Sequence, residues 1–126
     1  MNNLRISTAD NRTQFEPGET IPIVAEWSLD DHATEIEIRL VWHTEGKGDT
    51  DMDVVNTIDI KSPALRDTYR DSMQLPTKPY SFSGKLVSLL WGLELVVLPS
   101  EESTRLGITI APGGNEVVLH KQLIDA

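Results

Sequence analysis

The sequence predicts an all-β fold, specifically a two-sheet antiparallel β-sandwich of immunoglobulin-like architecture. Hydrophobic residues recur at every second position along most of the chain, and no segment sustains the three-to-four-residue spacing of an amphipathic helix. Clusters of Pro, Gly, Asn and Asp separate the alternating segments at short intervals. About seven or eight segments of this kind can be counted, which is the number expected for a sandwich.

The length of the chain predicts one domain, residues 1–126. A chain of 126 residues and 14.0 kDa matches the size of a single domain with one core. Its hydrophobic fraction of 39% is well above that of disordered chains. We therefore expect the domain to fold by itself.

The first half of the chain supplies three predicted strands. A short one lies near LRIS (4–7), and in TIPIVAEWSL (20–29) every odd residue is apolar and is expected to face the core. Pro22 cannot donate a ladder hydrogen bond, so this strand should begin or lie at a sheet edge there. TEIEIRLVWHT (34–44) follows after a short hairpin connection, with Trp42 expected inward and Val41 outward.

The middle of the chain predicts a hairpin tip and two more strands. EGKGDTDMD (45–53) is the tip, and a strand follows near MDVVNTIDI (52–60). RDTYRDSMQLP (66–76) can form a strand with Tyr69, Asp71 and Met73 on one side. A short helix over residues 63–71 remains the alternative, because Ala64, Leu65 and Tyr69 would share a helical face.

The segment LPTKPYSFSGKLVSLLWGLEL (75–95) combines two prolines with the longest apolar stretch. Pro76 and Pro79 should end one strand and direct the chain to the other sheet. The strand after them is apolar on both sides, so it is either central or bends at Gly92 and changes partners. Glu94 either lies on an exposed face or pairs with a base, and the pattern favours exposure.

The last part of the chain predicts two final strands. These are TRLGITIAP (104–112) and NEVVLHKQLI (115–124), and they are joined by a turn at residues 112–115.

Two motifs in this order resemble the signatures of the arrestin-like domain family. FEPGETIPIVAEW (15–27) is similar to the opening turn and strand of that family, and MQLPTKPYSFSGKLVSLLWGLEL (73–95) is similar to its later Leu-Pro turn and following strand. The resemblance implies an arrestin-type β-sandwich, as in arrestins, α-arrestins, the retromer small subunit and sporulation-control proteins. It also implies an adaptor or scaffold, not an enzyme. Family members usually carry two sandwiches and this chain has room for one, so no binding residues are carried over.

Charge and composition exclude several classes of function. The net charge is −9, with 20 acidic and 11 basic residues, and no basic cluster could neutralise phosphates, so nucleic acid is not expected as a partner. The apolar run 86–98 is too short for a membrane span of about 20 residues and is interrupted by Ser88 and Glu94. The chain has no Cys, and its beginning lacks a signal-peptide pattern, so we expect a cytoplasmic protein without membrane insertion.

Three carboxylates at alternate positions, Asp49, Asp51 and Asp53, form the sharpest candidate metal site. Their spacing resembles the start of a calcium-binding loop. Val54 and Ile60 stand where such a loop needs Gly and a bidentate Glu, so a solvated hairpin tip is favoured. A Ca²⁺-dependent or carbohydrate-binding module using the 45–53 loop is therefore the alternative function, and we expect no cofactor.

The sequence contains no arrangement typical of a catalytic site. The three histidines lie far apart, and no G-x-S-x-G motif is present. The three tryptophans fall on the apolar sides of their strands, which favours a core cluster over a carbohydrate platform.

These observations favour a non-catalytic protein-binding domain. The long apolar strand that begins within the second motif has a side that is only partly covered near its middle, and Leu86, Leu90 and Leu98 are the candidate interaction residues. We expect a protein partner of unknown identity, bound by sheet-face docking or by strand addition at an edge, and homo-oligomerisation through the same edge is a further option.

Overall fold

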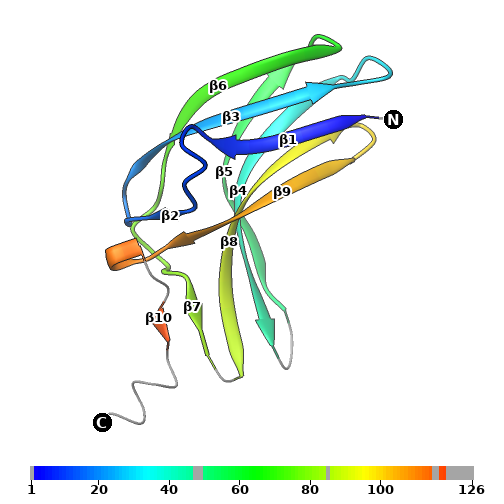
Figure 1. Ribbon diagram of the computed structural model, residues 1–126. Coiled ribbons are helices and arrows are strands. Elements are labelled where there is room, and N and C mark those ends of the chain that lie inside the picture. Colours follow the sequence, from blue (N-terminus) through cyan, green and yellow to red (C-terminus); the bar gives the residue numbers. More distant parts are fainter. Residues whose placement is uncertain (1, 47–49, 85, 115–116, 119–126) are drawn as a thin grey trace, which may run out of the picture.

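Almost all regular elements of the computed structural model, which describes residues 2–46, 50–84, 86–114 and 117–118, are β-strands (Figure 1). In chain order they are β1 (Asn3–Thr8), β2 (Gln14–Phe15), β3 (Thr20–Ser28), β4 (Glu35–Gly46), β5 (Met52–Lys61), β6 (Arg66–Gln74), β7 (Phe82–Ser83), β8 (Val87–Leu98), β9 (Ser103–Ile110), the 3₁₀ turn η1 (Pro112–Gly114) and β10 (Val117–Val118). Within these ranges no helix is long and apolar enough to cross a membrane.

The strands form two sheets that pack face to face, which confirms the predicted β-sandwich. The smaller sheet has the order β1-β3-β6 (Figure 1). The larger sheet has the order β10-β7-β8-β4-β5, with β9 alongside β8 and β2 alongside β9. All long strands pair antiparallel, whereas the two-residue strands β2 and β10 pair parallel with β9 and β7. Strands of two residues are too short to show alternation, so the sequence analysis missed β2 and β7.

The alternating residues of β3 and β4 build the core as predicted, except at Val24, which was expected outward but is buried, and at Val41 and Trp42. Every odd residue from 21 to 29 is buried, as are Ile36, Ile38 and Leu40. Val41, expected to be outward and exposed, is also buried, whereas Trp42 is only partly buried against the core. The register between β4 and β5 shifts at this point, because Leu40 lies opposite Asn56 and Val41 opposite Val54. This bulge bends the hairpin, so that side chains on its inner curve crowd around Val41.

The prediction that the strand begins or lies at an edge at Pro22 holds at that position, because β3 begins at Thr20, although further along β3 lies between β1 and β6. The pairing with β1 ends at Ile23, so Pro22 has a strand neighbour only on the β6 side, where it lies opposite Ser72. A missing backbone donor is tolerated at such a locally open position.

Residues 66–74 form strand β6, so the alternative of a short helix is wrong. The segment just before it is held in an extended path by the end of β3. The indole Nε1 of Trp27 donates to the Ala64 carbonyl at 2.8 Å, and the Leu29 amide donates to the Leu65 carbonyl at 2.7 Å. These carbonyls are therefore committed to β3 and cannot accept helical hydrogen bonds.

Strand β8 is a central strand and also changes partners near Gly92, so both of the alternatives that the sequence left open are correct. It pairs with β4 along one edge from end to end. Along its other edge it pairs first with β7, at Ser88 and Leu89, and then with β9 from Trp91 onward. The change occurs beside Gly92, as the pattern predicted.

The crossover from β6 to β7 follows the prediction from Pro76 and Pro79 and is fixed by hydrogen bonds to β8 and β9. The Trp91 indole donates to the Pro79 carbonyl at 3.0 Å. The buried Ser81 amide donates to the Ile110 carbonyl at 2.7 Å, and the Ile110 amide donates back to Ser81 Oγ at 2.9 Å. The second sequence motif therefore joins the two sheets.

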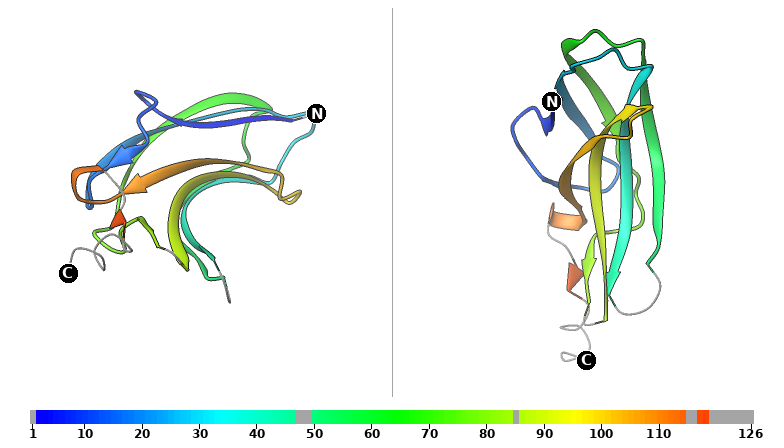
Figure 2. Two further views of the ribbon diagram at one scale, coloured as in Figure 1. Left: turned by 60° about the horizontal axis from the view of Figure 1, so that its bottom comes forward. Right: turned by 90° about the vertical axis from the view of Figure 1, so that its right-hand side faces the viewer.

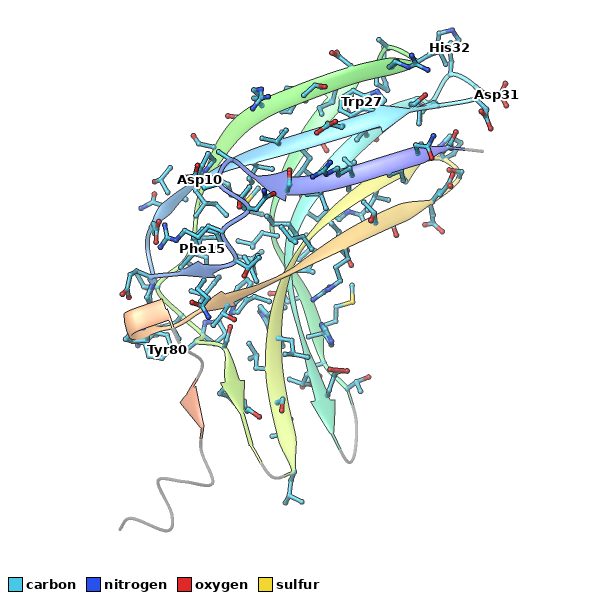
Figure 3. The ribbon with its side chains drawn as sticks, viewed as in Figure 1. Asp10, Phe15, Trp27, Asp31, His32 and Tyr80 are labelled. Carbon is cyan, nitrogen blue, oxygen red and sulfur yellow. The ribbon has the colours of Figure 1, made fainter. Side chains whose placement is uncertain are left out.

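The first motif forms a turn at the same end of the molecule as the crossover from β6 to β7, and Phe15 and Tyr80 both lie at this end (Figure 3). The Gly18 amide donates to the Pro76 carbonyl at 3.1 Å, which links the two motifs. Arg12 packs over the Phe15 ring, 4.7 Å from its centroid, and its two terminal nitrogens bind the Glu19 carboxylate, Nη2 to Oε1 at 2.9 Å. These hydrogen bonds from Arg12 are the main cause that lowers the pKa of Glu19.

The C-terminal predictions are confirmed as far as the described residues reach. Strand β9 matches the predicted TRLGITIAP segment, and η1 occupies the predicted turn. Of the predicted last strand, 115–124, β10 covers Val117–Val118, and residues 115–116 and 119–124 lie outside the described residues. Trp27 and Trp91 are buried and Trp42 packs in part against the core, opposite Trp91, which favours the predicted core position of the tryptophans.

We expect Ser81→Ala to destabilise the protein by about 1–3 kcal/mol, because the buried Ile110 amide would lose its acceptor. Urea unfolding followed by tryptophan fluorescence measures the change. Ser83→Ala is the control, since Ser83 makes no side-chain hydrogen bond in the described part of the chain. Equal stability of the two variants would contradict the role of Ser81.

We expect Glu19→Gln to lower stability at neutral pH and to lose this effect in acid. The pKa of Glu19 lies below its ordinary value of 4.5 in the folded protein, so its ionised form stabilises the fold above that value, and the stabilisation is lost as the pH falls through the folded pKa. Urea midpoints between about pH 7 and pH 3 measure the difference. Asp53→Asn, at an exposed position, is the control, and a constant difference for Glu19→Gln over this range would contradict the assignment.

Candidate functional site: the concave face of the large sheet

The long strands of the larger sheet curl, with their concave side turned away from the three-stranded sheet (Figure 2). The register of the strands shows which side chains project on this side, because directly opposed residues of an antiparallel pair point the same way. We call this surface the concave face, and it consists of Val41, His43, Met52, Val54, Leu90, Gly92, Glu94 and Arg105. Leu86 lies at its end, just before β8.

The concave face is organised in rows across the strands. Leu90, His43 and Met52 form one row, because His43 of β4 lies opposite both of the others. Gly92, Val41 and Val54 form the next row. Neighbouring strands are about 4.8 Å apart, so each row of three residues extends about 10 Å across the sheet, roughly the length of two turns of an α-helix.

Exposed apolar side chains gather at the end of the sheet formed by the β4–β5 hairpin and the start of β8. Met52 is 66% exposed and Leu86 is 64% exposed, and Val54, Val55 and Val87 are each about 40% exposed. Among the described residues only Leu65 and Tyr80 are large hydrophobic residues with comparable exposure elsewhere. Exposure of several apolar residues at one end of a sheet is unusual for a surface that stays in water.

The three predicted interaction residues do not form one surface. Leu86 and Leu90 lie at this apolar end, but Leu98 is at the opposite end of β8, where it faces Glu35. Eight residues of strand separate Leu90 from Leu98, about 26 Å when extended. The sequence analysis missed Met52 and Val54 because they lie on an edge strand that is rich in polar residues. The adjacent valines at 54–55 were the one sequence feature that indicated an apolar surface there.

A polar cluster borders the apolar end of the concave face. Arg105 of β9 binds Glu94, Nη1 to Oε2 at 3.3 Å, and lies near His43, Nη2 to Nδ1 at 3.1 Å. Its guanidinium rests on Gly92, where an added Cβ would come within 2.5 Å of Cζ. The expectation that Glu94 is simply exposed is wrong: Arg105 sits directly opposite it on β9 and pairs with it.

The predicted acidic metal site finds no support in the residues described. Asp49 lies outside the described residues, and Asp51 and Asp53 are both exposed. Asp51 continues the hairpin ladder, since its amide donates to Thr44 Oγ1 at 2.9 Å and its carbonyl accepts from the Thr44 amide. Asp53 lies opposite Trp42, on the side of β5 away from the concave face.

Three other carboxylates have oxygen atoms within 4.8 Å of one another: Glu35, Glu37 and Asp59. In the described part of the chain they are the one group of three side chains close enough to share a metal ion. Two of its members already have cationic partners. Lys61 Nζ binds Glu35 at 2.8 Å, which raises the pKa of Lys61, and Arg39 Nε binds Glu37 at 2.7 Å. The arrangement is a surface charge ladder across β4 and β5.

Neither the described histidines nor the cavity on the three-stranded sheet forms a catalytic pairing among the described residues. The described histidines lie apart, with His43 on the concave face and His32 in the β3–β4 loop (Figure 3). A cavity of about 620 Å³ lies on the three-stranded sheet near Arg5, Glu26 and Arg66, and no histidine lines it. A Ser-His arrangement is therefore absent from this cavity.

Comparison with solved structures supports a distant arrestin-like fold. The sporulation control protein Spo0M from Bacillus subtilis is similar with a TM-score of 0.63 and 12% identity, over 87% of this chain and 49% of that one. A β-glucosidase from Listeria innocua is similar with a TM-score of 0.50 and 12% identity, over 93% of this chain and 16% of that one. No family model and no curated protein sequence matches the chain. The chain thus spans about half the length of Spo0M and shares its fold.

We expect Gly92→Ala and Gly107→Ala to have opposite effects, although the two glycines lie opposite each other. An added methyl group at Gly92 would displace the Arg105 guanidinium, whereas space is open at Gly107. Gly107→Ala should stabilise the protein by up to about 0.5–1 kcal/mol by restricting the unfolded chain. Gly92→Ala should be less stable than Gly107→Ala, as measured by urea unfolding, and equal stabilisation by both would contradict the placement of Arg105.

Proposed function

We propose that this protein is a non-catalytic protein-binding module whose partner docks on the concave face. The observation that carries the proposal is the exposed apolar surface at the free end of the large sheet, formed mainly by Met52, Leu86 and Val54. Burying one such side chain fully contributes about 1.5–3 kcal/mol, so a partner that covers several of them gains substantial affinity.

The shape of this surface favours a convex apolar element of a partner protein, such as one amphipathic helix. A sheet that curls along its strands accommodates a helix laid across them, and each row of about 10 Å would contact roughly two turns of that helix. The row of Leu90, His43 and Met52 supplies apolar contacts. Arg105 and Glu94 at its border supply charged groups that can set the orientation of the bound element.

The structural similarity supports a regulatory role over a catalytic one. Spo0M is described as a sporulation control protein, and its likeness to this chain is consistent with a non-enzymatic regulatory module. The similarity to the β-glucosidase covers only a small part of that enzyme and gives no ground for an enzymatic activity here. The alternative of a Ca²⁺-dependent or carbohydrate-binding module is not favoured, because Asp51 and Asp53 join no cluster of three metal-ligating groups among the residues described.

The proposal is tested by affinity purification of the tagged protein at its natural level, followed by mass spectrometry. Met52→Asp and Leu90→Asp should each remove a partner that the unchanged protein captures reproducibly, because a carboxylate would be buried in the contact. Leu98→Asp is the matched control, since Leu98 projects on the same side of β8 but at its far end. Retention of every partner by both concave-face variants, or equal loss with Leu98→Asp, would contradict docking on the concave face.

A further inference from the structure

Strand β6 is an open edge of the smaller sheet. It pairs with β3 over nine residues without a register shift, and the described residues place no strand on its other side (Figure 1). Strand β5, the neighbouring edge of the larger sheet, is interrupted by its bulge at Val55. A bulge hinders the addition of a further strand, so β6 is the regular edge of the two.

Strand β6 carries two Arg-Asp pairs, at residues 66–67 and 70–71. Arg66 and Arg70 project on the outer side of the sheet, and Asp67 and Asp71 project on the other side. Their four directly opposed neighbours on β3 carry no charge: Ser28, Val24, Trp27 and Ile23. Strand β3 therefore provides no directly opposed charge for any of them.

No ion pair in the described part of the chain involves these four side chains. Glu26 lies opposite Thr68, between the two arginines, but binds neither. The carboxylates bind two amides that face away from β3, and an added strand would replace these two bonds: Asp67 accepts from the Thr68 amide at 2.8 Å, and Asp71 accepts from the Ser72 amide at 2.7 Å. Asp71 also accepts from Tyr69 Oη at 2.9 Å. The bond to Asp71 raises the pKa of Tyr69.

The same pattern argues against a second copy of this chain as the occupant of the edge. A two-fold antiparallel pairing of β6 with itself keeps each side of the sheet continuous, so even-numbered residues meet only even-numbered ones. Both arginines are even-numbered and both aspartates odd-numbered. No register of this pairing can place an arginine opposite an aspartate, and some registers oppose like charges, which is destabilising.

We propose that the β6 edge binds an extended segment of a partner protein, which adds as an antiparallel strand with complementary charges. Acidic residues of this segment would lie opposite Arg66 and Arg70, and basic residues opposite Asp67 and Asp71. Read in its own direction, the segment has the pattern basic, acidic, apolar, any residue, basic, acidic. The β6 edge is separate from the concave face, so this second binding site does not depend on the function proposed above.

The test uses two nine-residue peptides of identical composition. The matched peptide is Thr-Val-Thr-Lys-Glu-Val-Thr-Lys-Glu, which can pair from Gln74 to Arg66. The swapped peptide is Thr-Val-Thr-Glu-Lys-Val-Thr-Glu-Lys, with the same net charge. Titration of the isotope-labelled full chain by NMR gives both dissociation constants and the affected amides. Four charge pairs should make the matched peptide bind about tenfold more tightly, with the largest shifts in β6.

A charge-reversed protein provides the decisive control. The variant carries Arg66→Asp, Asp67→Arg, Arg70→Asp and Asp71→Arg, which leaves its net charge and its amino-acid composition unchanged. Its preference should reverse in favour of the swapped peptide. Non-specific attraction cannot produce this reversal, because net charges are equal throughout.

Three results would overturn the proposal: no binding of either peptide, equal binding of both, or a preference that does not reverse in the charge-reversed protein. None of these results tests docking on the concave face, because the concave face belongs to the larger sheet and β6 belongs to the smaller one. Conversely, a Met52→Asp protein that loses its captured partner should still distinguish the two peptides.

Discussion

The pairing of β4 with β8 is the interaction on which the rest of the structure depends. It extends without a shift from Glu35 opposite Leu98 to Gly46 opposite Val87. One side of this ladder supplies Ile38, Leu95 and Trp91 to the core. The other side is the concave face. Core and candidate binding surface are thus two sides of the same pair of strands, and a partner bound to one side rests on a packed interior.

Two segments that connect the sheets are fixed by hydrogen bonds from tryptophan side chains, and they hold the smaller sheet against this ladder. The Trp91 indole binds the Pro79 carbonyl at one end, and the Trp27 indole binds the Ala64 carbonyl at the other. In each case a buried ring spans the core while its N–H fixes a connecting segment, which satisfies the donor and sets the direction of the chain. This arrangement leaves β6 paired on one side only and its charges directed into solvent.

The sequence predicted the sandwich and its long strands because their inward residues alternate regularly, as Ile36, Ile38 and Leu40 do. It failed where curvature overrides alternation, as at Val41, whose burial depends on a bulge in another strand. It predicted Leu86 and Leu90 from local pattern but could not place Met52 beside them, because that contact depends on the β4–β5 register. The pairing of Glu94 with Arg105 similarly joins residues of two strands, and no local pattern contains it.

Residue-level hydrogen exchange of the free protein tests the central claim that a rigid β4–β8 ladder carries a sheet with an open β6 edge. Amides of β4 and β8 should exchange slowest, at the rate set by global unfolding. The amides of Arg66 and Arg70, directed away from β3, should exchange orders of magnitude faster, whereas those of Thr68 and Ser72 donate to the Asp67 and Asp71 carboxylates. Equal protection of all β6 amides would show that the edge is already covered, and fast exchange along β4 and β8 would contradict the ladder as the frame of the fold.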